Sequence, residues 1–490
     1  MLTAIKSTSA AVYIVLVMLT AAAYWVVVND LLAQQVCLVV LSALLLGYLW
    51  FEIKQVSTDQ KDLLLLNPAV LASIMTFVLG FGLSNILYIL PKDVVAAVEL
   101  PPEVTEWMNF LMILVLLGAL GMWLGYWSNV GIHLAGVLAQ SGFLGKVLRR
   151  EYQMRYGFFW SCVVLSFLVR IWMIKLGVYG YSSDLDRLYE LAAYREYLSI
   201  GESLGKLALM GAALQYYSQE ARKPHKWSLL LLLLSYEVIS GFVSGFKSLV
   251  VMPFLVVGLC AYFHERRFPR WLFPAVITGI FTAFLIIEPF RVARNEDAGF
   301  QGTNLTYIVD TMFGAKADDV SRADEGPAVW LSFLNRVNMT YVASRGIEFA
   351  HRGPLPEDAP NFLADILLAP FHAVIPRLLW ESKPVQDIGL WYTRHVFGYD
   401  FLSSTAMSPF TYLYFAGGIV AVFMGFFAVG VVQRAWWERF LLDGGSGCVV
   451  VYLGILSGLV GIDSAFNTFF IGLMRLFPLL LLAQYGLFKR

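Results

Sequence analysis

The side chains best suited to bind a phosphate lie in a short cationic segment in the last third of the chain. The segment, IPRLLWESKP over 375–384, carries Arg377 and Lys383. The planar guanidinium group of arginine donates two hydrogen bonds at once to phosphate oxygens, and lysine adds a point charge. Both residues belong to a polar insert, roughly 290–405, in an otherwise apolar chain. This pattern predicts a site for an anionic group at a membrane surface.

Other cations are expected at the same depth. Lys247 lies in a tight hairpin between two apolar runs, and Glu288 and Arg291 close the run that follows. If the helical part of the insert lies flat on the membrane, these positions converge with Arg377 at one interface. Arg291 and Arg377 are therefore the candidate catalytic cations. The candidate substrate-binding residues are Lys247, Arg294, Lys383, Trp380 and Arg394.

No metal or cofactor is expected. Asp184 and Asp186 have the spacing of a divalent-ion pair, but Arg187 follows directly, and a solvated acidic turn is the simpler interpretation. The cysteines lack the spacing of a metal site and fall in or beside apolar runs, so we expect small core residues rather than disulfides. They are Cys37, Cys162, Cys260 and Cys448.

Membrane-spanning helices must position these side chains. Of 490 residues, 59% are hydrophobic and only 14% are charged, and apolar runs of the roughly 20 residues that cross a bilayer recur along the chain. The net charge is zero, so no basic field exists for nucleic acid. The sequence predicts an all-α polytopic membrane bundle of about twelve spans. They lie near 8–28, 32–52, 68–90, 107–127, 156–178, 201–218, 227–245, 248–263, 271–289, 407–432, 446–462 and 464–487.

The predicted spans divide the chain into three parts. Nine spans occupy 1–289, the insert occupies 290–405, and three spans occupy 406–490. Within the insert, apolar and polar positions mix over 361–379 as in an amphipathic helix that lies on the membrane or packs over the bundle. Pro370 is expected to kink or end this helix.

The charges between the spans predict the orientation. With the N-terminus in the cytoplasm, six successive segments on that side are rich in lysine and arginine, whereas the short loops on the other side are poorer in cations. This is the positive-inside pattern, and it places both termini in the cytoplasm and the insert outside. The cations on the inner side include Lys61, Arg149, Arg150, Arg266, Arg267, Arg434 and Arg490.

Some ionisable residues fall inside predicted spans. A charge there costs about 2.5–3.5 kcal/mol on insertion scales, so each one needs a partner or a role. A snorkelling or salt-bridged structural charge is the simpler interpretation, and a transport pathway is the functional one. The residues are Arg170, Lys175, Glu237 and Arg475.

In its second half the chain resembles the Wzy-type polymerases that join the oligosaccharide repeat units of bacterial O-antigens and exopolysaccharides. The matching residues are Ile375-Pro376-Arg377, Trp380, Lys383-Pro384, Gly389, Phe397-Gly398, Ser408-Pro409 and Tyr414-Phe415-Ala416-Gly417-Gly418. The Lys247 hairpin and Pro289-Phe290-Arg291 are similar to further features of that family. Tyr412 and Tyr414 stand where many relatives have an acidic residue, which leaves the general base open.

The resemblance implies a glycosyltransferase of the bacterial inner membrane. It would move a growing glycan from one polyprenyl pyrophosphate to the non-reducing end of a second lipid-linked repeat unit. Negative charge develops on the departing pyrophosphate, and guanidinium groups can stabilise it without a metal. Arg291 and Arg377 would take this role, supported by Lys247 and Lys383. The implied partners are the polyprenyl-pyrophosphate-linked oligosaccharide, membrane lipids and a chain-length regulator.

The acceptor hydroxyl must lose a proton, so a general base is expected. His372 is one candidate, although it lies five residues before Arg377, too far round a helix to share its face cleanly. Glu288, Asp387 and His395 are open alternatives.

Other functions also stay open. An O-antigen-ligase-like enzyme would use a similar bundle and donor but would pass the glycan to the lipid A core. A transporter or flippase would place charges and broken helices at mid-membrane. A polyprenyl-phosphate-sugar transferase of another membrane family is disfavoured, because the first short outer turn offers only Asn29-Asp30 in place of an acidic motif.

Overall fold

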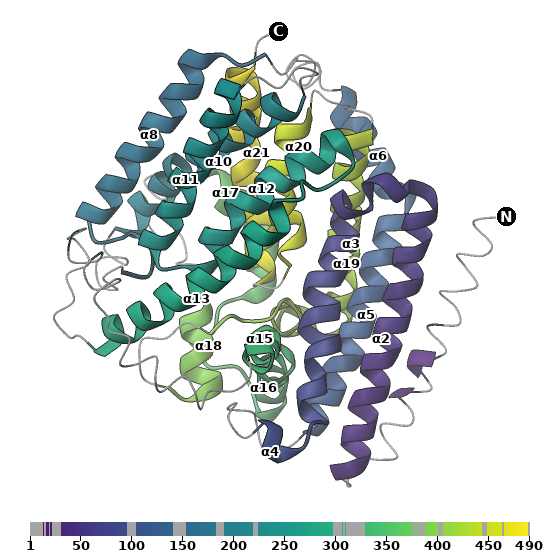
Figure 1. Ribbon diagram of the computed structural model, residues 1–490. Coiled ribbons are helices and arrows are strands. Elements are labelled where there is room, and N and C mark those ends of the chain that lie inside the picture. The colour runs from purple at the N-terminus through teal and green to yellow at the C-terminus, as the bar shows by residue number, and fades with distance from the viewer. Residues whose placement is uncertain are drawn as a thin grey trace.

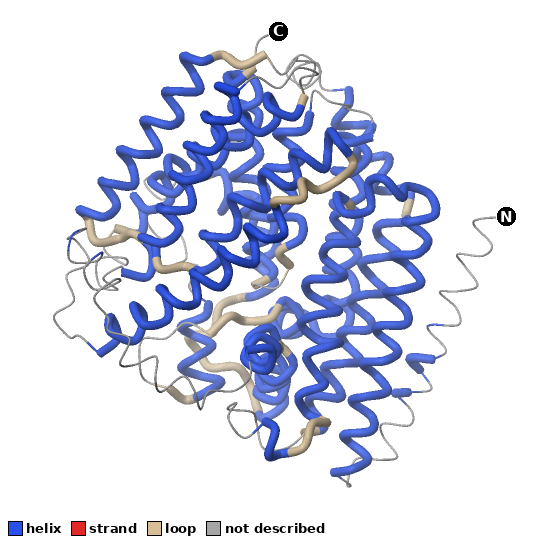
Figure 2. Tube along the Cα trace, in the orientation of Figure 1, coloured by secondary structure: helices blue, strands red, loops and turns tan. Residues whose placement is uncertain are grey.

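The chain folds as a bundle of helices (Figure 1). The computed structural model describes residues 31–95, 104–140, 153–182, 191–218, 224–296, 329–375, 388–399, 405–442, 448–462 and 465–488, and the single positions 13, 16–18, 20–21, 306, 309 and 380. Over this part the structure is 87% helical and has no strand, as the tube in Figure 2 makes plain. The prediction of an all-α fold is confirmed.

In the described ranges, eight helices are long and apolar enough to cross a membrane. Each of them coincides with a predicted span. They run over Leu32–Thr58, Pro68–Tyr88, Glu106–Trp127, Tyr156–Lys175, His225–Ser244, Lys247–Glu265, Pro409–Leu442 and Phe466–Leu487.

The other predicted spans have different outcomes. Two correspond to shorter apolar helices, Leu272–Ile287 and Val449–Val460. The predicted span 201–218 falls within the longer helix α10 (Ala192–Tyr217), which is less apolar than the eight because it includes charged residues. The predicted span 8–28 lies mostly outside the described residues.

The long helices form two groups, which lie on opposite sides of Figure 1. One group contains α2 (Leu31–Gln60), η1 (Lys61–Leu66), α3 (Pro68–Ala72), the π-helical η2 (Ser73–Gly82), η3 (Leu83–Tyr88), α4 (Lys92–Val95), α5 (Glu106–Trp127), α6 (Asn129–Gln140), α19 (Pro409–Trp436) and η6 (Trp437–Leu442). The other contains α8 (Tyr156–Lys175), η4 (Gly180–Ser182), α10, α11 (Pro224–Ser244), α12 (Lys247–Glu265) and α13 (Leu272–Glu296). Helices α20 (Val449–Val460) and α21 (Phe466–Leu487) contact both groups.

Glycines let α5 and α19 pack closely. A β-carbon at Gly121 or Gly125 of α5 would overlap the backbone of Phe423 or Phe427 in α19. Small residues at such positions allow two backbones to approach, which is the usual device for packing helices in lipid.

Helix α19 reverses direction near its start. Gly418 has φ +65° and ψ −150°, and Gly417 before it is extended. The segments on either side of this turn lie against each other: the rings of Phe410 and Phe426 stack with their centroids 4.5 Å apart. The chain therefore folds back on itself at the turn. Residues 409–416 therefore form a half-helix that lies against the following span. The predicted span 407–432 corresponds to the candidate span Pro409–Leu442. Its apolar run conceals the turn at Gly417 and Gly418.

The insert packs into one end of the bundle rather than standing apart from it. Helices α15 (Val329–Val337) and α16 (Thr340–Arg352) are joined by a turn that reaches the middle of the second described span. There the Met339 N–H donates to the Gly80 carbonyl at 3.0 Å, and the Thr340 hydroxyl donates to Asn85 Oδ1 at 2.7 Å. Gly80 lies eight residues before the end of that span at Tyr88, which is roughly 12 Å along a helix.

The predicted amphipathic helix over 361–379 is the shorter α17 (Phe362–Val374). Asn361 begins it by accepting a hydrogen bond from the Ala364 N–H at 3.0 Å, and Pro370 lies inside it without ending it. The helix packs along α21 and α19, while side chains such as Leu367 remain exposed. Of the two predicted placements, the structure has the one in which the helix packs over the bundle. A further helix, α18 (Ile388–Phe397), completes the described part of the insert.

The cysteines are core residues, as predicted. Cys162, Cys260 and Cys448 are buried, Cys37 is half-buried, and none of the four forms a disulfide.

Candidate functional site

The structure places some of the predicted site residues and leaves others outside its description. Arg377 and Lys383 lie outside the described residues. Arg291 and Arg294 belong to the last two turns of α13, where the backbone but not these side chains is described. Their convergence on one phosphate therefore stays a prediction.

Lys247 and the backbone at Arg291 lie at the same end of the second helix group, which is the group that contains α8 and α10 to α13. Lys247 begins α12, two residues after Gly245 in the hairpin from α11. Phe290, which directly precedes Arg291, is fully buried, and a β-carbon at Gly245 would touch its ring. Phe290 thus ties the end of α13 to the hairpin that carries Lys247.

His372 is buried in the last turn of α17. The residue as a whole is 2% exposed, and its ring centroid lies 5.2 Å from that of Trp380. The backbone carbonyl of His372 accepts a hydrogen bond from Arg475 Nη2 at 3.1 Å. A base must reach the substrate, so this burial favours a packing role for His372. The bond also gives Arg475 a structural task, since it caps a carbonyl at the end of a helix. Arg394 is exposed on α18.

A second histidine is better placed to accept a proton. His351, in the last turn of α16, has Nδ1 2.9 Å from the Ile347 carbonyl and Nε2 3.2 Å from the hydroxyl of Tyr414. Because a carbonyl oxygen can only accept, the neutral ring carries its proton on Nδ1, and Nε2 accepts from Tyr414. His351 is exposed, so a substrate can approach it.

Aromatic rings surround the contact between His351 and Tyr414. The His351 ring lies 4.5 Å from the Trp107 ring, 5.9 Å from the Phe110 ring and 5.7 Å from the Tyr414 ring, which is stacked on it. Trp107 and Phe110 are in the first turns of α5, and Tyr414 is in the half-helix. The pair therefore forms only because the insert folds back onto the bundle.

Two arginines share one carboxylate on the same helix. Arg345 Nη1 lies 2.7 Å from Glu348 Oε2, and Arg352 Nη2 lies 2.6 Å from Glu348 Oε1. The three side chains leave a net positive charge on α16, the helix that also carries His351, and such a charge suits an anionic group. Arg352 is the more exposed of the two arginines.

The alternative base His395 is paired with an acid. Its Nε2 lies 2.9 Å from Asp358 Oδ2 at the surface, and its ring lies 5.1 Å from the ring of Trp391. This contact joins α18 to the loop before α17. Among the described residues, no three histidine, cysteine or acidic side chains gather as metal ligands, and Asp184 and Asp186 lie outside them.

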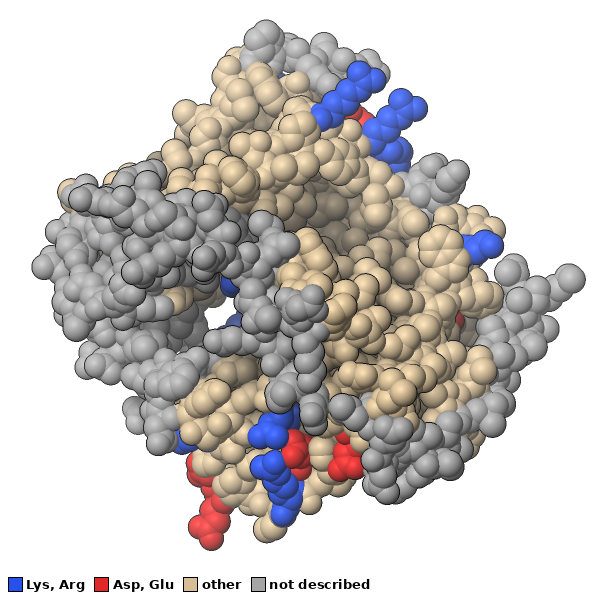
Figure 3. Space-filling model, turned by 60° about the horizontal axis from the view of Figure 1, so that its bottom comes forward, with Lys and Arg blue, Asp and Glu red and all other residues tan. Residues whose placement is uncertain are grey.

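Figure 3 shows the molecule from the end where the insert lies. The uncharged surface is hollowed near its middle. Charged side chains of both signs gather at its lower edge, and mostly Lys and Arg side chains lie at its upper right.

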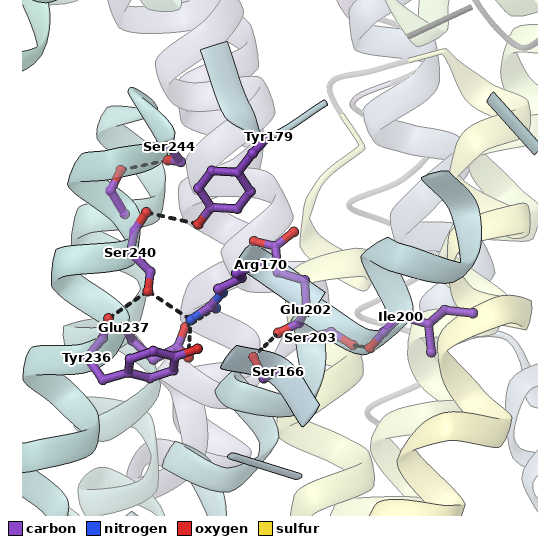
Figure 4. Close-up of polar contacts among 11 residues, drawn as sticks. Ser166, Arg170, Tyr179, Ile200, Glu202, Ser203, Tyr236, Glu237, Ser240 and Ser244 are labelled. Atoms are coloured by element: carbon purple, nitrogen blue, oxygen red, sulfur yellow. Dashed lines mark hydrogen bonds and ion pairs between the residues drawn. The ribbon is translucent and has the colours of Figure 1, made fainter. Parts of the chain in front are cut away.

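A buried ion pair joins α8 to α11 in the second helix group (Figure 4). Arg170 of α8 is 5% exposed and Glu237 of α11 is 2% exposed. Both Nη atoms of Arg170 donate to the Glu237 carboxylate, at 3.0 and 2.8 Å, and Nη1 also reaches Ser240 Oγ at 3.0 Å. The Tyr236 ring lies under the guanidinium at 4.9 Å. These contacts satisfy two of the intramembrane charges by pairing them with each other.

Sequence reasoning missed His351, Arg345 and Arg352. The available signal was the spacing of Arg345, Glu348 and Arg352 at three and four residues, which predicts a charged helix face. Nothing in the sequence pairs His351 with Tyr414, because 63 residues separate them.

The comparisons with known proteins identify a family. The profile of a family described as "Domain of unknown function (DUF8712)" matches residues 144–480. No curated protein and no solved structure matches the chain. The match includes α8 through most of α21, and so includes the insert, the half-helix and the ion pair, whereas Trp107 and Phe110 precede it. Since the match covers well over half of its length, the chain belongs to the DUF8712 family.

Proposed function

We propose that the protein is a membrane glycosyltransferase that polymerises oligosaccharide repeat units carried on polyprenyl pyrophosphate. The observation that carries the proposal is the contact between His351 and Tyr414. It places a proton acceptor among aromatic rings at the end of the bundle that holds the insert, on the helix that also carries Arg345 and Arg352. The resemblance to Wzy-type polymerases in the second half of the chain supports the same reaction.

The residues divide the work of glycosyl transfer. The acceptor hydroxyl gives its proton to His351 Nε2, either directly in place of Tyr414 or through the Tyr414 hydroxyl. The freed oxygen attacks C1 of the donor sugar as the bond from C1 to the pyrophosphate oxygen breaks, and the pyrophosphate keeps the electron pair. Guanidinium groups stabilise that charge. We assign this task to Arg291 and Arg377.

The orientation follows from the positive-inside pattern. We place the protein in the bacterial inner membrane with the insert on the outer side, where the lipid-linked glycan is presented. A chain-length regulator is the expected protein partner.

The test is a count of repeat units in cells that make the polymer. Replacing the gene with one that encodes His351→Gln should leave the protein in the membrane and should remove the ladder of long chains, leaving single repeat units. His133→Gln is the matched control, because this histidine is exposed on α6 and is not among the candidate bases. Normal chain lengths in the His351 variant would reject the proposal. Loss of every glycan from the lipid A core, rather than loss of long chains, would instead indicate a ligase.

A second candidate function is export of a lipid or polysaccharide. The broken helix at Gly417 and Gly418 and the buried Arg170–Glu237 pair favour it, because discontinuous helices and intramembrane charges are typical of transporters. Purified protein in vesicles separates the two functions. A transporter moves a labelled lipid-linked glycan across the bilayer without forming a glycosidic bond, whereas a polymerase forms the bond.

A further inference from the structure

Two side chains with buried, unpartnered donors contact one phenylalanine of the insert, and an acid follows that phenylalanine by one helical turn. The Phe362 ring, at the start of α17, lies 5.1 Å from the ring of Tyr412 in the half-helix and 5.8 Å from the ring of Trp391 in α18. Asp365 follows Phe362 in the first turn of α17. Three separate helices thus bring a phenol, an indole and a carboxylate to one place.

Both of the donors are buried and unsatisfied. The Tyr412 hydroxyl and the Trp391 Nε1 have no hydrogen-bond partner, and Tyr412 is only 1% exposed. Buried polar groups in folded proteins nearly always have a partner, so each exception calls for an explanation. These two unpartnered donors lie on adjoining helices, and the rings that carry them both contact Phe362.

Asp365 adds a hydrogen-bond acceptor to the two donors. The Asp365 side chain is half-buried, and among the described residues no hydrogen-bond donor contacts its carboxylate. Its charge is close enough to Tyr412 and His372 to interact with both. The site therefore offers two donors and one acceptor around an aromatic floor.

We infer that Asp365, Trp391 and Tyr412 form a binding subsite for a neutral sugar residue. A hydroxyl group both donates and accepts, so it can donate to Asp365 while it accepts from Tyr412 or Trp391. A phosphate does not fit, because Asp365 would repel it, and a simple cation offers nothing to the two donors. A sugar also has an apolar face, which can pack on aromatic rings.

This inference rests on the proposed function and names where its glycan lies. Tyr412 and Tyr414 belong to the same short half-helix, yet Tyr412 faces Phe362 of α17 and Tyr414 faces His351 of α16. The subsite therefore adjoins the proposed base across one helix. It would hold a sugar next to the one whose hydroxyl reacts.

Binding can be measured on the full-length protein in detergent. The probe is the repeat-unit oligosaccharide released from the polysaccharide of the same cells, with inorganic pyrophosphate as the anionic comparison. We expect Tyr412→Phe and Asp365→Asn each to weaken oligosaccharide binding about tenfold, as expected when one hydrogen bond to a ligand is lost. Exposed Tyr194→Phe, on α10, is the matched control and should bind like the parent protein.

Stability without ligand supplies an independent readout. If the Tyr412 hydroxyl has no internal partner, Tyr412→Phe should melt at the same temperature as the parent or higher. A lower melting temperature would show that the hydroxyl is satisfied within the protein, and the subsite would be rejected. Unchanged affinity in both variants, or no binding of the oligosaccharide to the parent, would reject it too. Trp391→Phe, compared with exposed Trp172→Phe, repeats the test if Asp365→Asn fails to fold.

The subsite and the proposed function fail in different ways. If His351→Gln keeps polymer formation while Tyr412→Phe weakens oligosaccharide binding, the subsite stands and the polymerase proposal falls. If His351→Gln abolishes the polymer while Tyr412→Phe binds normally, the reverse holds.

Discussion

Phe410 and Phe426 are sixteen residues apart in an apolar run, yet their rings stack at 4.5 Å. In a continuous helix these residues would be about 24 Å apart. The reversal at Gly417 and Gly418 brings them together, and it turns the start of α19 into a half-helix that presents Tyr412 to α17 and Tyr414 to α16. The proposed base and the proposed sugar subsite both depend on this turn.

Gly418 should therefore resist substitution. Its φ of +65° and ψ of −150° lie in a region that is essentially restricted to glycine, so Gly418→Ala should cost about 1–3 kcal/mol of stability. Thermal unfolding of the purified protein would measure this. Gly136→Ala is the control, because it lies in helix α6 with nothing within 4 Å of its β-carbon; equal melting temperatures for the two variants would contradict the expected strain.

The ion pair between Arg170 and Glu237 should be sensitive to the loss of either partner. Arg170→Met or Glu237→Met alone leaves a buried charge without its counter-charge and should cost about 3–5 kcal/mol. The double variant should recover most of that loss, because no charge then remains. Exposed Lys175→Met, on the same helix, should have little effect. A double variant as unstable as the single ones would show that the pair does more than neutralise itself.

The contact between His351 and Tyr414 should matter for rate. His351→Gln should lower the polymerisation rate by about 10²–10⁴-fold, the range for loss of a general base. Tyr414→Phe should have a smaller effect, because Nε2 of His351 stays available to the acceptor. Rates with purified lipid-linked repeat units would test the order of the two effects, and a larger effect of Tyr414→Phe would make the tyrosine the essential group.

Replacement by alanine and by lysine can test whether the two arginines bind pyrophosphate through two hydrogen bonds each. Arg291→Ala and Arg377→Ala should leave the protein in the membrane and abolish long polymer. Lysine at either position should restore polymer only in part, since it keeps the charge but loses the two-point hydrogen bonding. Gel analysis of chain length would show this. Full restoration by lysine would mean that charge alone is needed.

Asp365 should make stability depend on pH. Burial raises the pKa of the Asp365 carboxyl, and nearby His372 offsets part of that effect. The folded state therefore favours the protonated acid, and it loses stability relative to the unfolded state as the pH rises above the ordinary aspartate pKa of about 3.9. The melting temperature of Asp365→Asn minus that of the parent should increase as the pH rises from about 4 to 7. Parallel melting-temperature curves for Asp365→Asn and the parent would count against the buried carboxylate.

Hydropathy predicted the long spans because each one is a property of consecutive residues. The run Glu106–Trp127 is a helix for this reason, and its bounds were close to those predicted. Hydropathy could not reveal the turn at Gly417 and Gly418, because apolar residues continue on both sides of it. The glycine pair inside the span is the one local signal for such a reversal.

The candidate site was harder to predict because it joins distant parts of the chain. His351, Trp107 and Tyr414 meet only after the insert packs on α5, and no local pattern encodes that contact. The sequence offers His372 as a candidate base, but its face of α17 turns into the bundle, where it is 2% exposed. Which face of a helix is buried depends on distant packing partners, so the sequence around His372 does not reveal its access to a substrate.

The burial of the cysteines makes the orientation experimentally accessible. With three thiols inside the bundle and Cys37 half-buried, a Cys37→Ser protein should react little with a labelling reagent that cannot cross lipid. Single cysteines placed at exposed Arg352 and at exposed Val137 of α6 would then report from opposite ends of the molecule. Labelling of intact cells at the first position alone would establish which compartment the proposed catalytic face meets.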